Sequence, residues 1–448
     1  MARMILAESA IAQPIGDKAD GDAVYRRIVK RLLPLLMICY VLNYLDRSNV
    51  GFAKLEFQSA IGLTEAMFGL GAGLFYLGYS AFEIPSNLML AKIGARLTLL
   101  RIMTGWGLCA AAFSIMQTPA HYYILRLLLG IAEAGFFPGV LLLISFWIPA
   151  SRRAGFTAMF MSAMALSGII GGPISGFVMS SFDGVGGWDG WRWMFLIEGL
   201  PSVAMGVVVY LTLADTPDQA KWLTPEQKAT LRAEFDAEAA VQRARPTSHH
   251  DFRTVVKDYR IYTIAAMSIA MIASSAGLQF WLPTIIRQSG VSDVLHVGLL
   301  SAIPFIIAVI AQQIVARRSD RAGERRWHAA VSAFISAAGW LLLIISDHSL
   351  IPALFAATLI AGGFFGATGP FWALPSQYLS STAAAGGLAL IAMLGGVGSF
   401  ASPTIVGWLA TVGGSLKFGY IYYGSLMIAG PLIMLWGTAM MDRQKTGG

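Results

Sequence analysis

Long apolar runs recur along this chain, and their length and spacing constrain its fold more than any other feature. A helix needs about 20 mostly apolar residues to cross a bilayer. Twelve stretches meet that length, at residues 32–53, 66–90, 96–117, 121–146, 155–181, 192–213, 261–286, 295–316, 328–346, 350–378, 383–411 and 418–440. The sequence therefore predicts an all-α, multi-pass membrane protein, which we expect in the cell inner (plasma) membrane.

The composition excludes a soluble protein of this length. Only 13% of the residues are charged and 56% are hydrophobic, whereas soluble chains average roughly 25% charged residues. Cys39 and Cys109 both lie inside apolar runs, which favours packing roles over a disulfide. The polar residues before the first run do not resemble a cleavable signal, so we expect that run to be an uncleaved span.

The runs form two sets of six, which indicates a duplicated half. The predicted parts are a tail at 1–31, a six-helix bundle at 32–213, a linker at 214–260, a second six-helix bundle at 261–441 and a tail at 442–448. Within the linker, Thr224, Pro225 and Gln227 have the spacing of a capped helix start. The residues that follow predict a surface helix.

Basic residues predict the orientation. If the N-terminus is inside, 26 of the 32 lysine and arginine residues lie on the cytoplasmic side. The outer loops then hold only Lys54, Arg192, Arg287 and Lys417. This bias predicts that both termini are cytoplasmic. We therefore expect the net charge of +7 to face the lipid bilayer surface, and no nucleic-acid partner.

Ionisable residues inside the predicted spans are the main functional candidates. Each costs about 2.5–3.5 kcal/mol on insertion scales, so few persist without a role. The six candidates all lie in the first half and are Asp46, Arg47, Glu83, Arg126, Glu133 and Glu198. The six spans of the second half contain no Asp, Glu, Lys or Arg. We therefore expect the first half to handle charge and the second to supply shape and neutral contacts.

Helical spacing places several of these residues together. At about 1.5 Å per residue, Arg47 and Arg126 lie at a similar depth, roughly 8–9 Å inside the outer surface. Glu133 follows Arg126 by two turns on the same helix face. The hypothesis is that Arg47, and with it Arg126, binds a substrate carboxylate through a planar guanidinium. Asp46 and Glu133 are then the proton carriers, because burial favours a protonated carboxyl and a neighbouring arginine favours the ionised one.

Structural roles remain open for the same residues. The alternative for Arg126 and Glu133 is a structural ion pair that only holds the spans together. Glu83 lies near the cytoplasmic end of its span, which favours a gate or a packing role, and Glu198 favours a structural role.

Aromatic and amide residues are the candidates for the remaining walls of a pocket. In the first half, Tyr44 and Tyr79 are placed to bond a carboxylate or hydroxyl. The second half offers Gln279, Trp281, Trp372 and Gln377. For the two tryptophans, a place in the interfacial aromatic belt is the alternative.

Two loops carry one pattern at equivalent places in the two halves. Residues 87–96 read NLMLAKIGAR and residues 316–325 read ARRSDRAGER. Both resemble the short G-x-L-x-D-R-x-G-R-R loop of the major facilitator superfamily, although Ala91 stands where an acid is usual in the first copy. The resemblance implies a gate built from Lys92, Gly94, Arg96, Asp320, Arg321, Gly323 and Arg325.

Further motifs narrow the resemblance. They are residues 43–51 (NYLDRSNVG), 82–87 (FEIPSN), 126–135 (RLLLGIAEAG), 280–283 (FWLP) and 371–375 (FWALP). Together they resemble the anion:cation symporter family, which includes carriers for galactonate, tartrate, phthalate, 4-hydroxyphenylacetate and sialic acid. The resemblance implies two bundles that alternate access to a central cavity, a functional monomer, and protonation of Asp46 and Glu133. It implies protons as the coupling ion and no metal or other cofactor.

The motif departures bear on the substrate. Ala392 and Gly396 stand where family members that carry sugar acids often offer amides, and Met164 is apolar as well. An aromatic or short aliphatic carboxylate, including a dicarboxylate, is therefore favoured. The expected function is proton-driven uptake of such an anion, and the alternative is an anion exchanger or a drug or metabolite exporter of the same fold.

Other classes of function are disfavoured. An enzyme needs a nucleophile and base or a metal cluster, and all six histidines lie in loops or at span ends. A channel needs a carbonyl filter or a ring of charges, and neither pattern is present in the sequence.

Overall fold

A computed structural model describes residues 18–244, 256–346, 349–378 and 381–446 of the chain. The first half contains α2 (Lys18–Ala60), α3 (Glu65–Ile93), α4 (Ala95–Ala112), α5 (Pro119–Glu133), α6 (Phe136–Trp147), α7 (Ala150–Phe182) and α8 (Gly190–Thr212). The second half contains α11 (Tyr259–Gln288), α12 (Val294–Ala322), α13 (Arg326–Leu342), α14 (Leu350–Ala373), α15 (Pro375–Tyr378), α16 (Ser381–Gly413) and α17 (Lys417–Thr446). Between them lies α9 (Pro225–Ala244).

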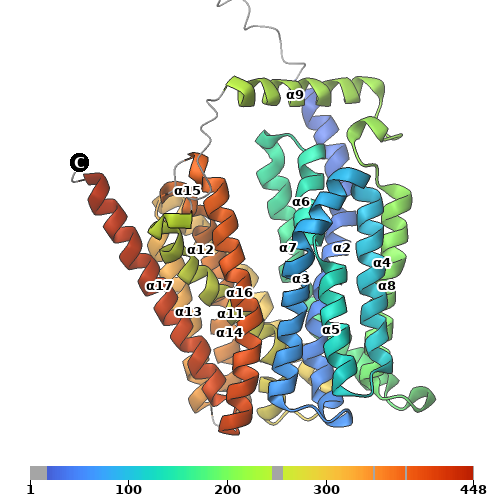
Figure 1. Cartoon of the computed structure of the whole chain (residues 1–448), viewed down its shortest axis with the longest axis vertical. Helices are drawn as coiled ribbons and strands as arrows, with labels where there is room; N and C mark the ends of the chain where they lie inside the picture. Colours follow the sequence, from blue (N-terminus) through green and yellow to red (C-terminus); the bar gives the residue numbers. More distant parts are fainter. Residues whose placement is uncertain (1–17, 245–255, 347–348, 379–380, 447–448) are drawn as a thin grey trace, which may run out of the picture.

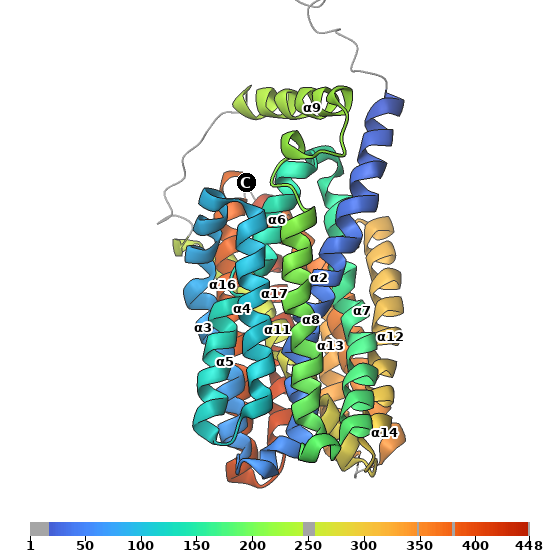
Figure 2. The same ribbon diagram turned by 90° about the vertical axis from the view of Figure 1, so that its right-hand side faces the viewer.

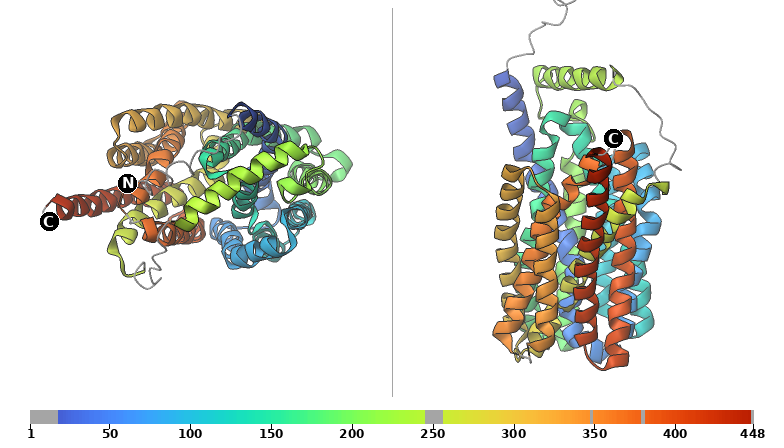
Figure 3. Two further views of the ribbon diagram at one scale, coloured as in Figure 1. Left: turned by 90° about the horizontal axis from the view of Figure 1, so that it is seen from above. Right: turned by 90° about the vertical axis from the view of Figure 1, so that its left-hand side faces the viewer.

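The two halves form two bundles of roughly parallel helices that lie side by side (Figure 1). Helix α9 crosses one end of the N-terminal bundle (Figure 3). We call this end the linker end and the other the far end. Helix α2 extends past its bundle to the level of α9 (Figure 2), where Arg27 donates a hydrogen bond to Gln227 at 3.2 Å.

Apolar length supports most of the predicted spans. Among the described residues, eleven helical segments are long and apolar enough to cross a membrane, with α5 and α6 counted together. The second predicted span, now α3, is not one of the eleven, although it is a 29-residue helix. It carries Glu65, Glu83 and Lys92 and packs between α5 and α16. A multi-pass helical membrane protein is confirmed, and the count of twelve stays a prediction.

The predicted span at 121–146 is two helices instead of one. Helix α5 ends at Glu133, Ala134 leaves the helical region (φ −55°, ψ 130°), and Gly135 is left-handed (φ 88°) before α6 begins. A Cβ on residue 135 would lie 2.5 Å from Ser86 Oγ of α3. Glycine is therefore required both by the backbone angle and by the close approach.

The linker helix begins as its sequence predicts. Thr224 Oγ1 accepts a hydrogen bond from the Gln227 amide at 3.3 Å, and Gln227 Oε1 accepts one from the Thr224 amide at 3.2 Å. This reciprocal capping box satisfies two amides that helix geometry would otherwise leave unpaired.

Small residues bring the two bundles together toward the far end. A Cβ on Gly69 of α3 would lie 2.2 Å from the Pro403 oxygen of α16, and one on Gly298 of α12 would lie 2.3 Å from the Gly172 oxygen of α7. Such residues allow backbones to approach closely. The helices of the two bundles diverge toward the linker end (Figure 1), so the described inter-bundle contacts close the far end.

Candidate functional site

Arg47 of α2 and Glu133 of α5 form an ion pair. Arg47 Nη2 donates to Glu133 Oε1, and the Glu133 side chain is fully buried while 20% of the Arg47 side chain is exposed. The guanidinium also lies over the rings of Phe75 (5.1 Å) and Tyr79 (5.4 Å) of α3. Glu133 is thus paired, as the structural hypothesis supposed, but its partner is Arg47 and not Arg126.

The break between α5 and α6 positions this acid. Glu133 is the last residue of α5, and the chain turns away at Ala134 and Gly135. Broken helices within a membrane protein expose backbone groups and side chains that a continuous helix would not present. The sequence signal for the break is the Gly135 to Pro138 segment, which we did not interpret as an interruption.

Arg126 of α5 lies between α3 and α11. It is completely buried, and it donates to the carbonyl oxygens of Gly71 (3.3 Å) and Ala72 (3.4 Å). Its guanidinium lies over Phe75 (4.8 Å) and Phe280 (5.6 Å). The far-end closure therefore covers Arg126, so a substrate role for it requires a conformation in which α3 and α11 separate.

Asp46 faces the interior of the N-terminal bundle. Its Oδ2 accepts hydrogen bonds from Trp106 Nε1 (3.1 Å) and Ser202 Oγ (2.8 Å). Although Asp46 and Arg47 are consecutive, they occupy different faces of α2, as helix geometry predicts.

A pocket lies between the two bundles, and one of its lining residues, Tyr44, is within electrostatic range of Arg47. Helix α2 contributes Tyr44 and Ser48, one residue on from Arg47, and Tyr44 lies beside Ser275 of α11. Further lining residues include Gln279, Phe305 and Phe365. The amide nitrogen of Gln279 is buried and has no hydrogen-bond partner among the described residues. The pocket therefore offers hydroxyl and amide groups on an aromatic surface.

The other sequence candidates lie outside this pocket lining. Tyr79 contacts Arg47, and Glu83, one turn further along α3, lies within electrostatic range of the same guanidinium. Trp281 is buried in the far-end interface, where its ring packs against Phe68 and Phe280. Trp372 lies near the linker end of α14 and is partly exposed. Gln377 lies on α15.

Comparison with known proteins decides the family. The sequence profile of the Major Facilitator Superfamily matches residues 36–403. This chain belongs to that superfamily. An Agrobacterium vitis protein named as a tartrate transporter is 41% identical over 412 residues, covering 92% of this chain and 90% of the relative. This superfamily member is a membrane transporter and not an enzyme, and the predicted resemblance is confirmed.

Two further likenesses extend the comparison. A quinolone resistance transporter of Acinetobacter baumannii is 38% identical over 425 residues, covering 94% of this chain and 96% of that protein. A bacterial homologue of the human lysosomal transporter Spinster, solved in an inward-facing and unoccupied conformation, superposes with a TM-score of 0.71 at 17% identity. That superposition covers 95% of this chain and 97% of the other, and it shows the shared superfamily fold.

The superfamily loop takes a different form in each half. In the second half, Gly323 is left-handed (φ 63°) and Arg325 Nη1 lies 2.5 Å from Asp320 Oδ1 of the same loop. In the first half, where Ala91 replaces the acid, Gly94 has φ 87° and the Arg96 amide donates to Asp215 Oδ1 at 2.8 Å.

Asp215 follows α8 and is a residue that the sequence analysis missed. The side chain of Arg96 also donates to the Tyr210 carbonyl at 2.6 Å. Lys92 and Arg321 occupy the exposed surface beside the two loops. The hydrogen bonds and ion pairs that the structure describes for Arg96 and Arg325 stay within their own halves.

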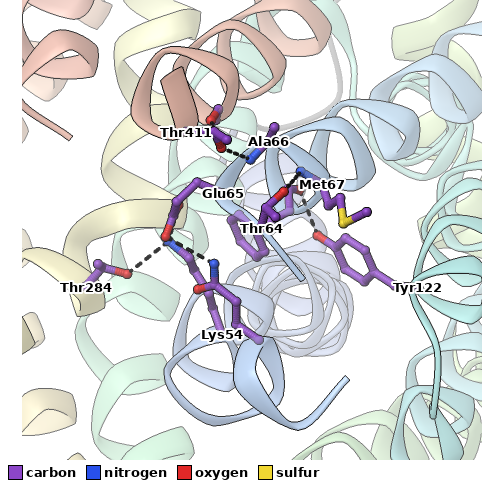
Figure 4. Close-up of polar contacts among 11 residues, drawn as sticks. Lys54, Thr64, Glu65, Ala66, Met67, Tyr122, Thr284 and Thr411 are labelled. Carbon is purple, nitrogen blue, oxygen red and sulfur yellow. Dashed lines mark hydrogen bonds and ion pairs between the residues drawn. The ribbon is translucent and has the colours of Figure 1, made fainter. Parts of the chain in front are cut away.

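The far-end closure of this transporter contains a buried charge (Figure 4). Lys54 Nζ pairs with Glu65 Oε2 at 2.8 Å and lies 3.5 Å from Thr284 Oγ1 of α11. Nearby, the Ala66 amide donates to Thr411 Oγ1 of α16 at 2.8 Å. We call these five residues the far-end lock. The expectation that Lys54 lies in an outer loop is wrong, because α2 continues to Ala60 and only 1% of the Lys54 side chain is exposed.

Proposed function

We propose that this transporter takes up a small organic anion together with protons by alternating access. The observation that carries the proposal is the Arg47–Glu133 ion pair, which Tyr44 connects to the inter-bundle pocket that it lines. A substrate carboxylate that reaches Arg47 competes with Glu133 for the same guanidinium. Once displaced, Glu133 is a buried carboxylate without its cation, and binding a proton removes that cost. Anion and proton are therefore bound together.

The pocket lining supports a carboxylate with an apolar body. Tyr44, which lies within electrostatic range of Arg47, lines the pocket from the N-terminal bundle, whereas Phe305 and Phe365 come from the C-terminal bundle. Ser275 and Gln279 offer hydrogen bonds to a second polar group. An aromatic carboxylate or a short dicarboxylate fits this arrangement, and the relative named as a tartrate transporter supports a small carboxylate.

The charge distribution supports the direction of access. Described basic residues such as Arg27, Lys92, Arg152 and Arg321 lie at the linker end, which we take as the cytoplasmic side of the cell inner membrane. The far-end lock then closes the outer side. On this assignment the pocket opens inward, and opening outward requires Lys54 and Thr284 to separate.

The second candidate is an exporter or exchanger of the same fold. The relative named as a quinolone resistance transporter is nearly as similar as the tartrate relative. An exporter driven by protons binds its cargo from inside and the proton from outside, so the two compete. A symporter instead binds both from the same side.

Purified protein in liposomes with an internal pH dye separates these candidates. A panel of aromatic and aliphatic carboxylates is presented outside, with and without an inward proton gradient. Symport predicts accumulation above equilibrium, internal acidification during uptake, and loss of accumulation when a protonophore is added. Internal alkalinisation during carboxylate uptake, or accumulation that ignores the protonophore, would contradict the proposal.

A further inference from the structure

A second pair of acidic side chains is buried on the opposite face of α2. Asp46 is 1% exposed and Glu198 of α8 is 2% exposed. Both lie within segments that are long and apolar enough to cross a membrane. The mechanism proposed above gives Glu198 no role, and the sequence analysis favoured a structural one.

The two acids face one another across α2 and α8. On α2, Asp46 and Asn49 are three residues apart and therefore share one face of the helix. On α8, Glu198 and Ser202 are four residues apart and also share one face. Ser202 Oγ donates to Asp46 Oδ2 at 2.8 Å, which joins the two faces. Glu198 lies within electrostatic range of Asp46, and the Asn49 amide lies beside the Glu198 carboxyl.

Every hydrogen-bond donor described for this pair is neutral. Ser175 of α7 donates to Glu198 Oε1 at 2.8 Å, and Trp106 of α4 donates to Asp46. Among the described residues, Asp46 is the one charged side chain that acts on Glu198. The nearest guanidinium along the chain, Arg47, is turned to Glu133 on the other side of α2.

Several polar atoms at this place lack partners among the described residues. They are Asp46 Oδ1, Glu198 Oε2 and both amide atoms of Asn49, which is fully buried. Buried polar atoms in folded proteins are almost always satisfied. A proton on either carboxyl would give the neighbouring carboxyl oxygen a donor, which supports a protonated acid at this place.

We propose that Asp46 and Glu198 form one proton-binding site, so that Glu198 takes part in proton coupling. Two carboxylates at close quarters without a cation cannot both be ionised at low cost, and they titrate as a pair. The site communicates with the substrate through α2. Asp46 and Arg47 are consecutive residues, so a rotation of α2 that follows substrate binding at Arg47 also moves Asp46 against α8. This proposal rests on proton symport as the proposed function.

Infrared difference spectroscopy after a pH jump tests the pair without substrate. The wild-type protein is expected to show a protonated-carboxyl band that Glu198→Gln loses in part, together with about one bound proton fewer per protein. Asp236→Asn, which changes an exposed carboxyl of α9, is the matched control and should leave the band unchanged. A band and a proton count in Glu198→Gln that equal those of the wild type would overturn the proposal.

Ser175→Ala gives a milder test in case Glu198→Gln does not fold. The Ser175 hydroxyl donates to the Glu198 carboxyl and favours its ionised form. Removing it should shift the frequency of the protonated-carboxyl band, because that frequency depends on the hydrogen bonds of the carboxyl. A band that keeps its wild-type frequency contradicts the proposal. Because neither measurement uses substrate or a gradient, their failure is distinct from a failure of proton-driven uptake in liposomes.

Discussion

The N-terminal and C-terminal bundles share one fold and differ in chemistry. The first contains two sets of ionisable groups, Arg47 with Glu133 toward α3, and Asp46 with Glu198 in the bundle interior. The second contributes hydroxyl, amide and aromatic groups such as Ser275, Gln279 and Phe365 to the pocket. The proposed carboxylate substrate would therefore bind with its charge toward the N-terminal bundle and its body toward the C-terminal one.

The difference leads to the hypothesis that coupling and selectivity are separable in this transporter. Changes in the N-terminal bundle should alter transport rate and proton dependence together. Changes in the C-terminal bundle should alter which anion is preferred and leave the proton dependence in place. The variants that follow test this division, from the largest expected effect to the smallest.

Arg47→Lys should abolish transport. An ammonium keeps the charge but loses the planar fork that binds a carboxylate through two hydrogen bonds. We expect initial uptake in liposomes to fall by about 100-fold or more, as expected for a loss of about 2.7 kcal/mol. Arg318→Lys, at an exposed position of α12, is the matched control. Transport within a few-fold of wild type would show that Arg47 does not hold the carboxylate.

Glu133→Gln should uncouple the transporter. The amide cannot carry a proton, but it preserves the shape of the side chain at the end of α5. Exchange of labelled for unlabelled substrate should persist, whereas accumulation driven by a proton gradient should be lost. The measurement compares both rates on one preparation. Accumulation against a gradient in this variant would remove Glu133 from the coupling step.

Lys54→Met should weaken the closure that joins the two bundles. The change removes a buried ammonium that contacts Glu65 and Thr284 and lies over the Phe68 ring at 4.8 Å. Because Glu65 is a quarter exposed, water relieves part of the loss, and we expect about 1–3 kcal/mol less stability for the closed far end.

Cross-linking at the same place measures the closure. The Ala66 amide and Thr411 Oγ1 are 2.8 Å apart, so cysteines at these two positions should cross-link readily. The rate should fall when Lys54→Met is added. Lys221→Met, on the exposed surface near the linker, should not change it. An unchanged rate in the Lys54 variant would show that the lock does not depend on this charge.

Gln279→Ala should change selectivity without changing coupling. It removes an amide that lines the pocket from α11, and a single hydrogen bond contributes about 0.5–1.5 kcal/mol. The KM for carboxylates with a second polar group should rise about 3- to 10-fold. The KM for simple monocarboxylates should stay unchanged. The pH profile should match the wild type. A shifted pH profile would contradict the hypothesis that the C-terminal bundle sets selectivity without affecting the proton dependence.

Asp215→Asn should have the smallest effect. It weakens the acceptor for the Arg96 amide, which a neutral side-chain oxygen still satisfies in part. We expect a decrease in thermal stability equivalent to about 0.5–1 kcal/mol. Asp320→Asn, in the equivalent loop, breaks the ion pair with Arg325 and provides the comparison. A larger loss from Asp320→Asn would indicate that the two loops use their acids differently.

Features that depend on local pattern were predictable from the sequence. Apolar length predicted the helices, the Thr224 to Gln227 spacing predicted the start of α9, and intramembrane charge singled out Arg47 and Glu133. These follow because hydrophobic length and helix caps are set by residues close in sequence. The sequence also separated Asp46 from Arg47 by helix geometry alone.

Features that depend on contacts between distant residues were not predictable in this way. Whether Glu133 pairs with Arg47 or Arg126 depends on how α2, α3 and α5 pack. The hydrogen bond from the Arg96 amide to Asp215 joins residues more than a hundred positions apart. The sequence analysis placed Lys54 in a loop. The burial of its ammonium depends on Glu65 and on the opposing bundle, and the local sequence does not reveal these contacts.

The end of α5 at Glu133 has a consequence for how Arg47 behaves during a transport cycle. The last carbonyl groups of a helix carry partial negative charge, which attracts cations even when no acid is ionised. On the proposed coupling, protonation of Glu133 therefore weakens the attraction for the guanidinium without removing it. The partial charge of the helix end would then favour a position of Arg47 close to the acid that it pairs with in the structure.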